Sequence, residues 1–194
     1  AIYACFKNWG LAIEPSDAAY ITGRTWASAF EFLFKKYKLP VPADEASEQM
    51  MQAYRDSLEV HLGIVPGGAA AVRALAPHYE LALVSGSNRQ EIFWALDKLK
   101  IREHFKIVLG AEDYPNSKPA PDGYLKALQL MGRDASRTLI FEDSQPGIAS
   151  GRAAGAWVVA ITGTNHFKQD TTQAHHHIPD LSGINPKWVS EVFG

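Results

Sequence analysis

The sequence predicts an α/β protein in which strands and helices alternate along most of the chain. Three short apolar runs, each typical of a buried strand, occupy residues 81–84, 107–109 and 138–141. A helical pattern follows each run, which indicates the strand–helix units of a parallel sheet. The residues before this region show helical patterns without strands, so we expect a small all-helical segment ahead of the sheet.

The helices of the first segment are predicted from the spacing of apolar residues. Ile2, Phe6 and Trp9 recur at helical spacing, and Gly10 ends that pattern. A third helical pattern starts near Asp44, a plausible N-cap, and continues past Met50. Between them lies a wide apolar stripe, made by Trp26, Phe30, Leu33, Phe34 and Tyr37. These patterns predict a small helical bundle.

The change from helices to strand–helix units falls at a turn. Pro66, Gly67 and Gly68 mark that turn, and a helix over residues 69–75 leads into the first strand. We therefore expect two domains, a helical one over residues 1–63 and an α/β one over residues 64–194.

Composition sets broad limits. The chain has 194 residues, of which 46% are hydrophobic, so a sizeable core is expected. The formal net charge of −2 gives no electrostatic case for binding nucleic acid or an anionic membrane. A single cysteine, Cys5, fits a reducing compartment, and we expect a cytoplasmic protein. The oligomeric state stays open, and a monomer is compatible with the sequence.

Polar residues follow each predicted strand at the point where it ends. Ser85 ends the first strand, Lys118 follows the second, and Glu142 and Asp143 follow the third. Ligands of such sheets bind beyond the carboxyl ends of the strands, so we expect these side chains to converge. A hydroxyl and an ammonium group suit a phosphoryl oxygen, and paired carboxylates suit Mg²⁺.

These three sites resemble motifs of the haloacid dehalogenase (HAD) superfamily, in the same order. Leu83-Val84-Ser85 matches the second motif, and Lys118-Pro119-Ala120-Pro121 matches the third. Glu142-Asp143, followed by a turn containing Gly147, matches the fourth. The resemblance is close over residues 65–161 and looser before them. It extends to members with a helical cap, such as β-phosphoglucomutase and small sugar-phosphate phosphatases.

The resemblance implies a doubly wound, Rossmann-like core with a small helical cap, and a role for each site residue. Ser85 and Lys118 would be catalytic and would also bind the phosphoryl group, while Glu142 and Asp143 would hold Mg²⁺. Further substrate contacts would come from Gly86, Ser87 and Asn88, and from Arg24 in the cap. An alternative for Arg24 is a solvated side chain at the start of a helix.

The first motif of the superfamily, an Asp-x-Asp-Gly run at the end of the first core strand, does not occur in residues 1–194. Its first Asp is the nucleophile of the family. Without that strand, two neighbouring strands would each expose an unpaired edge, at a cost of about 1–3 kcal/mol for each unsatisfied buried group. We therefore expect an N-terminal segment, upstream of Ala1, to carry the first strand and the nucleophile.

Three functions remain open from the sequence. The first is a Mg²⁺-dependent phosphatase of a small phosphorylated metabolite, acting through an aspartyl-phosphate. The second is a phosphomutase similar to β-phosphoglucomutase, and the third is a non-catalytic protein that binds phosphate or metal.

The run His175-His176-His177 has the composition of a metal site, but consecutive histidines point in different directions. We interpret this run as a solvated loop.

Overall fold

The structure is a computed structural model that describes residues 2–60 and 62–194 and separates into two compact units. The first unit comprises Ala1–Thr22 and Trp26–Ile64. The second comprises Val65–Gly194 together with the short segment Gly23–Thr25. The helical and the α/β parts of the chain thus divide after Ile64, and three residues around Arg24 group with the α/β unit.

The first unit is all helical in its described residues. Its helices are α1 (Ile2–Asn8), α2 (Pro15–Ile21), α3 (Trp26–Lys36) and α4 (Ala43–Val60). The helix α4 begins at Ala43, so Asp44 lies in its first turn rather than at the N-cap. The spacing of apolar residues does not predict the short helix α2. This helix begins at Pro15, a residue suited to the first helical position.

The core of the first unit gathers apolar side chains from all four helices. Phe6, Leu33 and Met50 are fully buried, and Cys5 lies beside them. The ring of Tyr37 meets that of Phe6 edge to face at 5.0 Å between centroids. The hydroxyl of Tyr37 donates a hydrogen bond to Asp17, which also pairs with Lys36. A buried carboxylate is thus satisfied inside this bundle.

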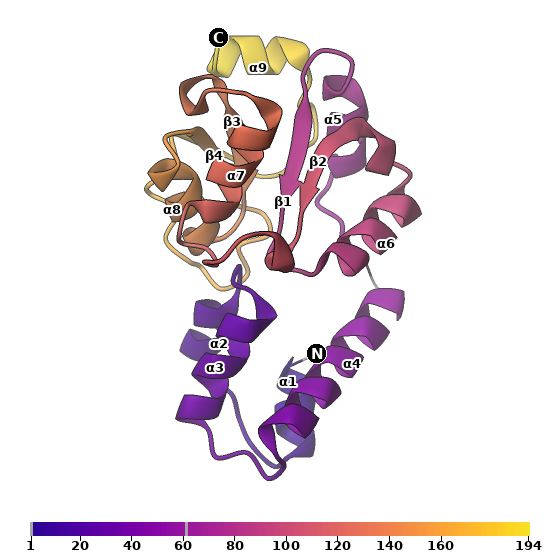
Figure 1. Cartoon of the computed structure of the whole chain (residues 1–194), viewed down its shortest axis with the longest axis vertical. Helices are drawn as coiled ribbons and strands as arrows, with labels where there is room; N and C mark the ends of the chain where they lie inside the picture. Colours follow the sequence, from indigo (N-terminus) through magenta and orange to yellow (C-terminus); the bar gives the residue numbers. More distant parts are fainter. Residues whose placement is uncertain (1, 61) are drawn as a thin grey trace. The chain divides into compact units, whose positions relative to one another are not determined.

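The second unit alternates strands and helices, which confirms the predicted α/β class with parallel strands (Figure 1). Its strands are β1 (Leu81–Val84), β2 (Phe105–Leu109), β3 (Leu139–Glu142), β4 (Trp157–Ile161) and β5 (His176–Ile178). Its α-helices are α5 (Gly68–Leu75), α6 (Arg89–Leu99), α7 (Asp122–Met131), α8 (Gln145–Ala153) and α9 (Pro186–Val192). Short 3₁₀ turns are η1 (Arg102–His104), η2 (Ala111–Asp113) and η3 (Ala135–Arg137).

The strands form two sheets rather than one. In the first, β1 pairs with β2, and in the second the order is β3-β4-β5. Over the residues that the structure describes, β1 and β3 therefore each have a strand neighbour on one side only.

Helices cover both faces of the strands, as in a doubly wound fold. Successive residues of a strand point to opposite faces, and β4 shows this alternation clearly. Val159 and Ile161 pack with residues of α5 and α9, whereas Val158 and Ala160 pack with Ile140 and Ile148. Both sets are buried, so β4 lies in the middle of the unit with apolar layers on each side.

The strand β5 corrects the expectation of a solvated loop at the histidine run. His176 and His177 pair in parallel with Val159 and Ala160 of β4. The ring of His175 stacks on that of Trp157 at 4.2 Å, and its Nδ1 accepts a hydrogen bond from the Val158 N–H. Pairing with a buried strand outweighs the polar character of these side chains.

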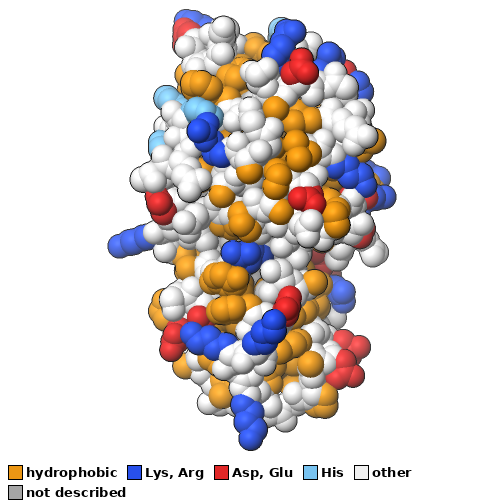
Figure 2. Space-filling view, turned by 60° about the vertical axis from the view of Figure 1, so that its left-hand side comes forward, with side chains coloured by type: hydrophobic (Ala, Val, Ile, Leu, Met, Phe, Trp, Pro, Cys, Tyr) orange, Lys and Arg blue, Asp and Glu red, His pale blue; other side chains and the backbone are white. Residues whose placement is uncertain are grey.

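The surface mixes charges of both signs. On the face shown in Figure 2, basic and acidic side chains are interspersed, and hydrophobic side chains lie between them. Within residues 2–60 and 62–194, no helix has the length and apolar character needed to cross a membrane.

Candidate active site

The end of β1 presents the first candidate residues. The Ser85 N–H donates to Leu109 O at 3.0 Å, which continues the β1–β2 pairing, and Ser85 Oγ accepts from the Ser87 N–H at 3.2 Å. The Asn88 side chain accepts from the Glu91 N–H at 2.9 Å and caps α6. Residues 85–88 are half-buried. Their backbone thus turns sharply at the carboxyl end of the strand.

Glycine at position 86 permits a close approach of two chain segments within the second unit. A Cβ at this position would lie 2.8 Å from Arg24 O, closer than real Cβ contacts. The Arg24 Nη1 atom lies 3.5 Å from Lys118 O. The structure therefore brings Arg24 to the loop that carries Lys118, while its contact with a substrate stays a prediction.

Lys118 joins the ends of two strands that do not pair with each other. Its residue is 8% exposed. The ammonium donates to Val84 O at 3.2 Å, to the Tyr124 hydroxyl at 3.1 Å, and to Glu142 Oε1, with which it forms an ion pair. Lys118 is therefore not an ordinary surface lysine. Its ammonium is buried, and a buried ammonium requires a paired carboxylate, which Glu142 supplies.

Glu142 is the last residue of β3 and is 7% exposed. Its Oε1 accepts from Lys118 and from the Tyr124 hydroxyl, and its Oε2 accepts from Ser144 Oγ at 3.4 Å. The carboxylate lies against the backbone of Gly147, where a Cβ would be 2.0 Å from Oε2. These hydrogen bonds and the close contact with Gly147 therefore fix the position of the Glu142 carboxylate.

Asp143 follows directly and is more open to solvent. Its Oδ2 accepts a hydrogen bond from Thr164 Oγ1 at 3.2 Å. Loss of hydration at the carboxylate raises the pKa of Asp143, and the neighbouring charge of Glu142 raises it further. A cation near Asp143 would offset both effects.

Two carboxylates on adjacent residues fit part of a magnesium site. Mg²⁺ prefers oxygen ligands and commonly takes one or two carboxylates, with water and substrate phosphate completing its shell. Asp143 is accessible, and Glu142 Oε2 has one protein donor, which leaves an acceptor position. Among the described residues, no three His, Cys, Asp or Glu gather in one place, so further ligands would come from outside this set.

Two tyrosines complete the site, and the sequence analysis did not identify them. The Tyr114 hydroxyl donates to Ser85 O at 2.7 Å, and burial raises the pKa of Tyr114 to about 12. The Tyr124 hydroxyl lies between Lys118 and Glu142. Burial and the charge of Glu142 raise the pKa of Tyr124 well above its ordinary value, so both hydroxyls are protonated donors. In sequence, Tyr124 is only an aromatic position in the first turn of a helix.

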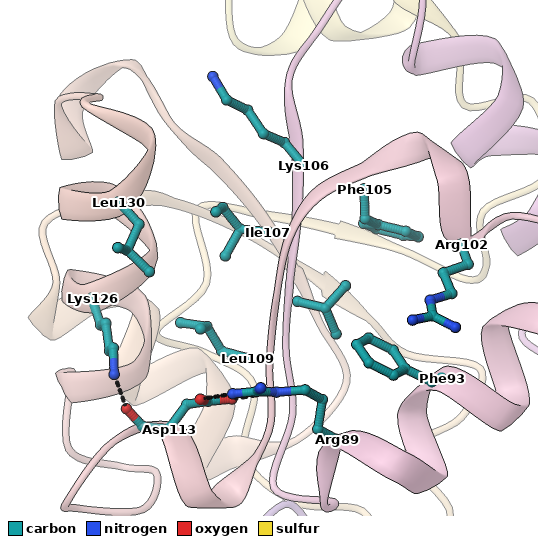
Figure 3. A pocket seen from close by; sticks show the side chains of 11 residues that line it. Arg89, Phe93, Arg102, Phe105, Lys106, Ile107, Leu109, Asp113, Lys126 and Leu130 are labelled. Atoms are coloured by element: carbon teal, nitrogen blue, oxygen red, sulfur yellow. Dashed lines mark hydrogen bonds and ion pairs between the residues drawn. The ribbon is translucent and has the colours of Figure 1, made fainter.

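A hollow of about 520 Å³ lies elsewhere in the unit, along β2 between α6 and α7 (Figure 3). Arg89 and Asp113 form an ion pair across one end of it, and the Lys126 ammonium donates to Asp113 O. Ser85, Lys118, Glu142 and Asp143 do not line this hollow. It is therefore separate from the site at the strand ends.

The fold and the site define an α/β protein with a lysine, an acidic pair and a serine at the carboxyl ends of parallel strands. A family model described as haloacid dehalogenase-like hydrolase matches residues 1–161. The chain belongs to this family.

Two relatives found by sequence comparison have names that describe them as phosphatases. The chain is 28% identical over 194 residues to the bifunctional riboflavin kinase/FMN phosphatase of Arabidopsis thaliana, covering 96% of this chain and 49% of that protein. It is 29% identical over 155 residues to the phosphoglycolate phosphatase of Pseudomonas putida, covering 78% of this chain and 57% of that protein. The chain thus spans about half the length of these relatives.

The fold has close counterparts among solved structures. A putative β-phosphoglucomutase from Thermotoga maritima superposes with a TM-score of 0.71 at 18% identity, covering 98% of this chain and 89% of that one. The likeness in fold covers nearly all of the chain and, together with the family match, confirms the HAD-like architecture.

Proposed function

We propose that the chain belongs to a Mg²⁺-dependent phosphoric monoester hydrolase that acts on a small phosphorylated metabolite. The observation that carries the proposal is the buried Lys118 ammonium, held at the carboxyl ends of β1 and β3 beside the acidic pair. Phosphoryl transfer depends mainly on positioning and on neutralising charge, and these residues supply both. The names of the phosphatase relatives support the same reaction class.

Each residue of the site has a role in this proposal. Lys118 donates to a phosphoryl oxygen and neutralises its charge, and Ser85 Oγ donates to a second oxygen. Glu142 and Asp143 hold Mg²⁺, which supplies positive charge to the transferring group. In this proposal Gly86, Ser87 and Asn88 contact the substrate at the same turn, Gly86 through its backbone, and Arg24 binds an anionic group of the substrate.

The nucleophile in this proposal is an aspartate carboxylate on a strand between β1 and β3. Its oxygen forms a bond to phosphorus as the bond from phosphorus to the alcohol oxygen breaks, and that oxygen takes a proton from solvent water as the alcohol leaves. Water then attacks the aspartyl-phosphate, which releases inorganic phosphate and restores the carboxylate. The separate sheets support this arrangement, because β1 and β3 each lack a second strand neighbour in the described chain.

The test uses the protein expressed from its natural gene, with any upstream segment present. Release of inorganic phosphate is measured from FMN, phosphoglycolate and a hexose phosphate, with Mg²⁺ and with a chelator. We expect Mg²⁺-dependent release from at least one ester, and the Lys118→Met variant should lose it. Asp97→Asn, in an exposed pair with Arg102, is the control that should keep it.

The outcomes separate the three functions. Phosphate released to water supports the hydrolase, while transfer of labelled phosphate between two positions of a sugar supports a phosphomutase. Absence of both reactions with all esters, in a folded protein, would indicate a non-catalytic binding protein. The proposal places the enzyme in the cytoplasm, where a lone thiol such as Cys5 stays reduced.

A further inference from the structure

The ammonium of Lys118 has a complete set of hydrogen-bond acceptors in this structure. An ammonium carries three N–H donors, and those of Lys118 meet Val84 O, the Tyr124 hydroxyl and Glu142 Oε1. A phosphoryl oxygen that binds Lys118 therefore takes the place of one of these three partners. Among these three acceptors, the Tyr124 oxygen belongs to a neutral side chain, and the same hydroxyl also donates a hydrogen bond to Glu142. We therefore take the Tyr124 oxygen as the acceptor that the phosphoryl oxygen replaces.

The hydroxyl of Tyr124 contacts both members of the buried ion pair. It accepts from Lys118 at 3.1 Å and donates to Glu142 Oε1. Tyr124 is partly buried and packs against the apolar cluster that includes Ile140 and Ile148. The hydroxyl is therefore fixed by a ring that is itself anchored in the core.

We infer that Tyr124 is a positioning residue for the phosphatase reaction: its hydroxyl orients the Glu142 carboxylate and, through it, the Lys118 ammonium toward the phosphoryl group. The inference rests on the proposed function. When a phosphoryl oxygen replaces the Tyr124 oxygen as an acceptor for Lys118, Tyr124 keeps its own donation to Glu142. Glu142 Oε1 then stays directed at the lysine, and Oε2, which accepts from Ser144 Oγ, keeps a second acceptor position for a cation.

The first unit contains a matched control. There, Tyr37 donates to Asp17 and Lys36 pairs with the same carboxylate, so the two clusters share a lysine, a tyrosine and an acid. Tyr37→Phe and Tyr124→Phe each remove one hydroxyl that donates to a carboxylate, and both leave the ring in place. Only Tyr124 lies at the strand ends of the second unit.

The experiment compares the natural protein with its Tyr124→Phe and Tyr37→Phe variants by three measurements. Steady-state kinetics use the best phosphate ester, thermal unfolding reports the fold, and acetic anhydride labelling with mass spectrometry reports how firmly Lys118 is held. For Tyr124→Phe we expect kcat to fall about tenfold without a rise in KM, because the effect concerns the transition state. We also expect faster acetylation of Lys118, and neither change in Tyr37→Phe.

The measurements separate the inference from the proposed function. Normal kcat and normal Lys118 labelling in Tyr124→Phe would overturn the role of Tyr124, and so would a fall in kcat with unchanged labelling. If the natural protein hydrolyses no ester but Lys118 labelling still rises in the variant, the hydroxyl holds the lysine and the proposed function is what fails. A rise in KM equal to the fall in kcat/KM would indicate a substrate-binding role instead and would contradict positioning.

Discussion

The charged side chains of the candidate site differ in whether an opposite charge lies beside them. The ammonium of Lys118 is paired with the carboxylate of Glu142. Both groups are nearly removed from solvent. Removing one partner of a buried pair leaves an uncompensated charge, which typically costs about 3–5 kcal/mol. We therefore expect Lys118→Met to lower the free energy of unfolding by about that amount in urea titrations.

Two further variants make that measurement decisive. The double variant Lys118→Met with Glu142→Gln removes both charges and should recover most of the loss. Lys35→Met breaks an exposed pair with Glu31, which solvent screens, and should change stability far less than Lys118→Met does. A loss no larger for Lys118→Met than for Lys35→Met would contradict a buried ion pair.

Unlike the paired charges of Lys118 and Glu142, the carboxylate of Asp143 has little compensation from positive charge among the described residues. Its pKa is raised above the ordinary 3.8, so the folded chain keeps the proton to a higher pH than the unfolded chain does. The free energy of unfolding should therefore fall as the pH rises through that interval and stay level above it. Asp143→Asn should abolish that fall in thermal unfolding without Mg²⁺, and under the proposed function it should reduce turnover at least about a thousandfold, because it removes the carboxylate proposed to hold the metal. A Tm lowered by this variant at neutral pH would contradict the assignment.

At the scale of elements, the junction between α2 and α3 depends on a buried carboxylate. Burial raises the pKa of Asp17, but hydrogen bonds from Lys36 and Tyr37 lower it further, and the net pKa is lowered from 3.8. Stability from this carboxylate is therefore present above its unfolded pKa and is lost as the pH falls through the folded value. We expect Asp17→Asn to cost about 1–3 kcal/mol at neutral pH. Glu31→Gln, in an exposed pair on α3, is the control and should cost far less.

The start of α8 constrains the active site through Gly147. A Cβ there would lie 2.0 Å from Glu142 Oε2, so Gly147→Ala must displace the carboxylate or the helix. We expect a loss of about 1–3 kcal/mol together with a strong fall in turnover. Gly63→Ala, where a Cβ meets nothing within 4 Å, should be neutral in both measurements. Equal behaviour of the two variants would contradict the close contact.

Elements also show where sequence analysis succeeds and where it does not. The strands ending at Val84, Leu109 and Glu142 are predictable because short apolar runs precede turn residues. The strand β5 is not, because its histidines are polar and its pairing with β4 depends on distant chain segments. Tyr124 is missed for the same reason: the contact of its hydroxyl with Glu142 spans 18 positions in the sequence.

For the whole molecule, the two separate sheets predict an uneven pattern of amide hydrogen exchange. The strand β4 pairs on both sides and Val158, Val159 and Ala160 are 0% exposed, so its amides should exchange most slowly. The strands β1 and β3 have one described neighbour each and should exchange faster. Mass spectrometry on the 194-residue chain checks this. Equal protection of β1 and β4 would mean that a further segment covers the open edge of β1.

The fold of the second unit was predictable as a whole, since alternating strands and helices allow few other arrangements. The clustering of Lys118 with Glu142 followed from the rule for strand ends. The order of strands and the satisfied state of the Lys118 ammonium were not predictable, because they depend on how segments pack in three dimensions.

The apolar cluster that joins α5, β4 and α9 has a consequence for the synthesis of the chain. It unites Ala71 with Val159 and Val189, so its two ends are separated by most of the unit. Contacts between segments so far apart form slowly and only after the intervening chain is available. During synthesis, the apolar side of α5 is therefore incompletely covered until β4, β5 and α9 have all left the ribosome. Chains that stop before Pro186 should be bound by chaperones or degraded rather than accumulate.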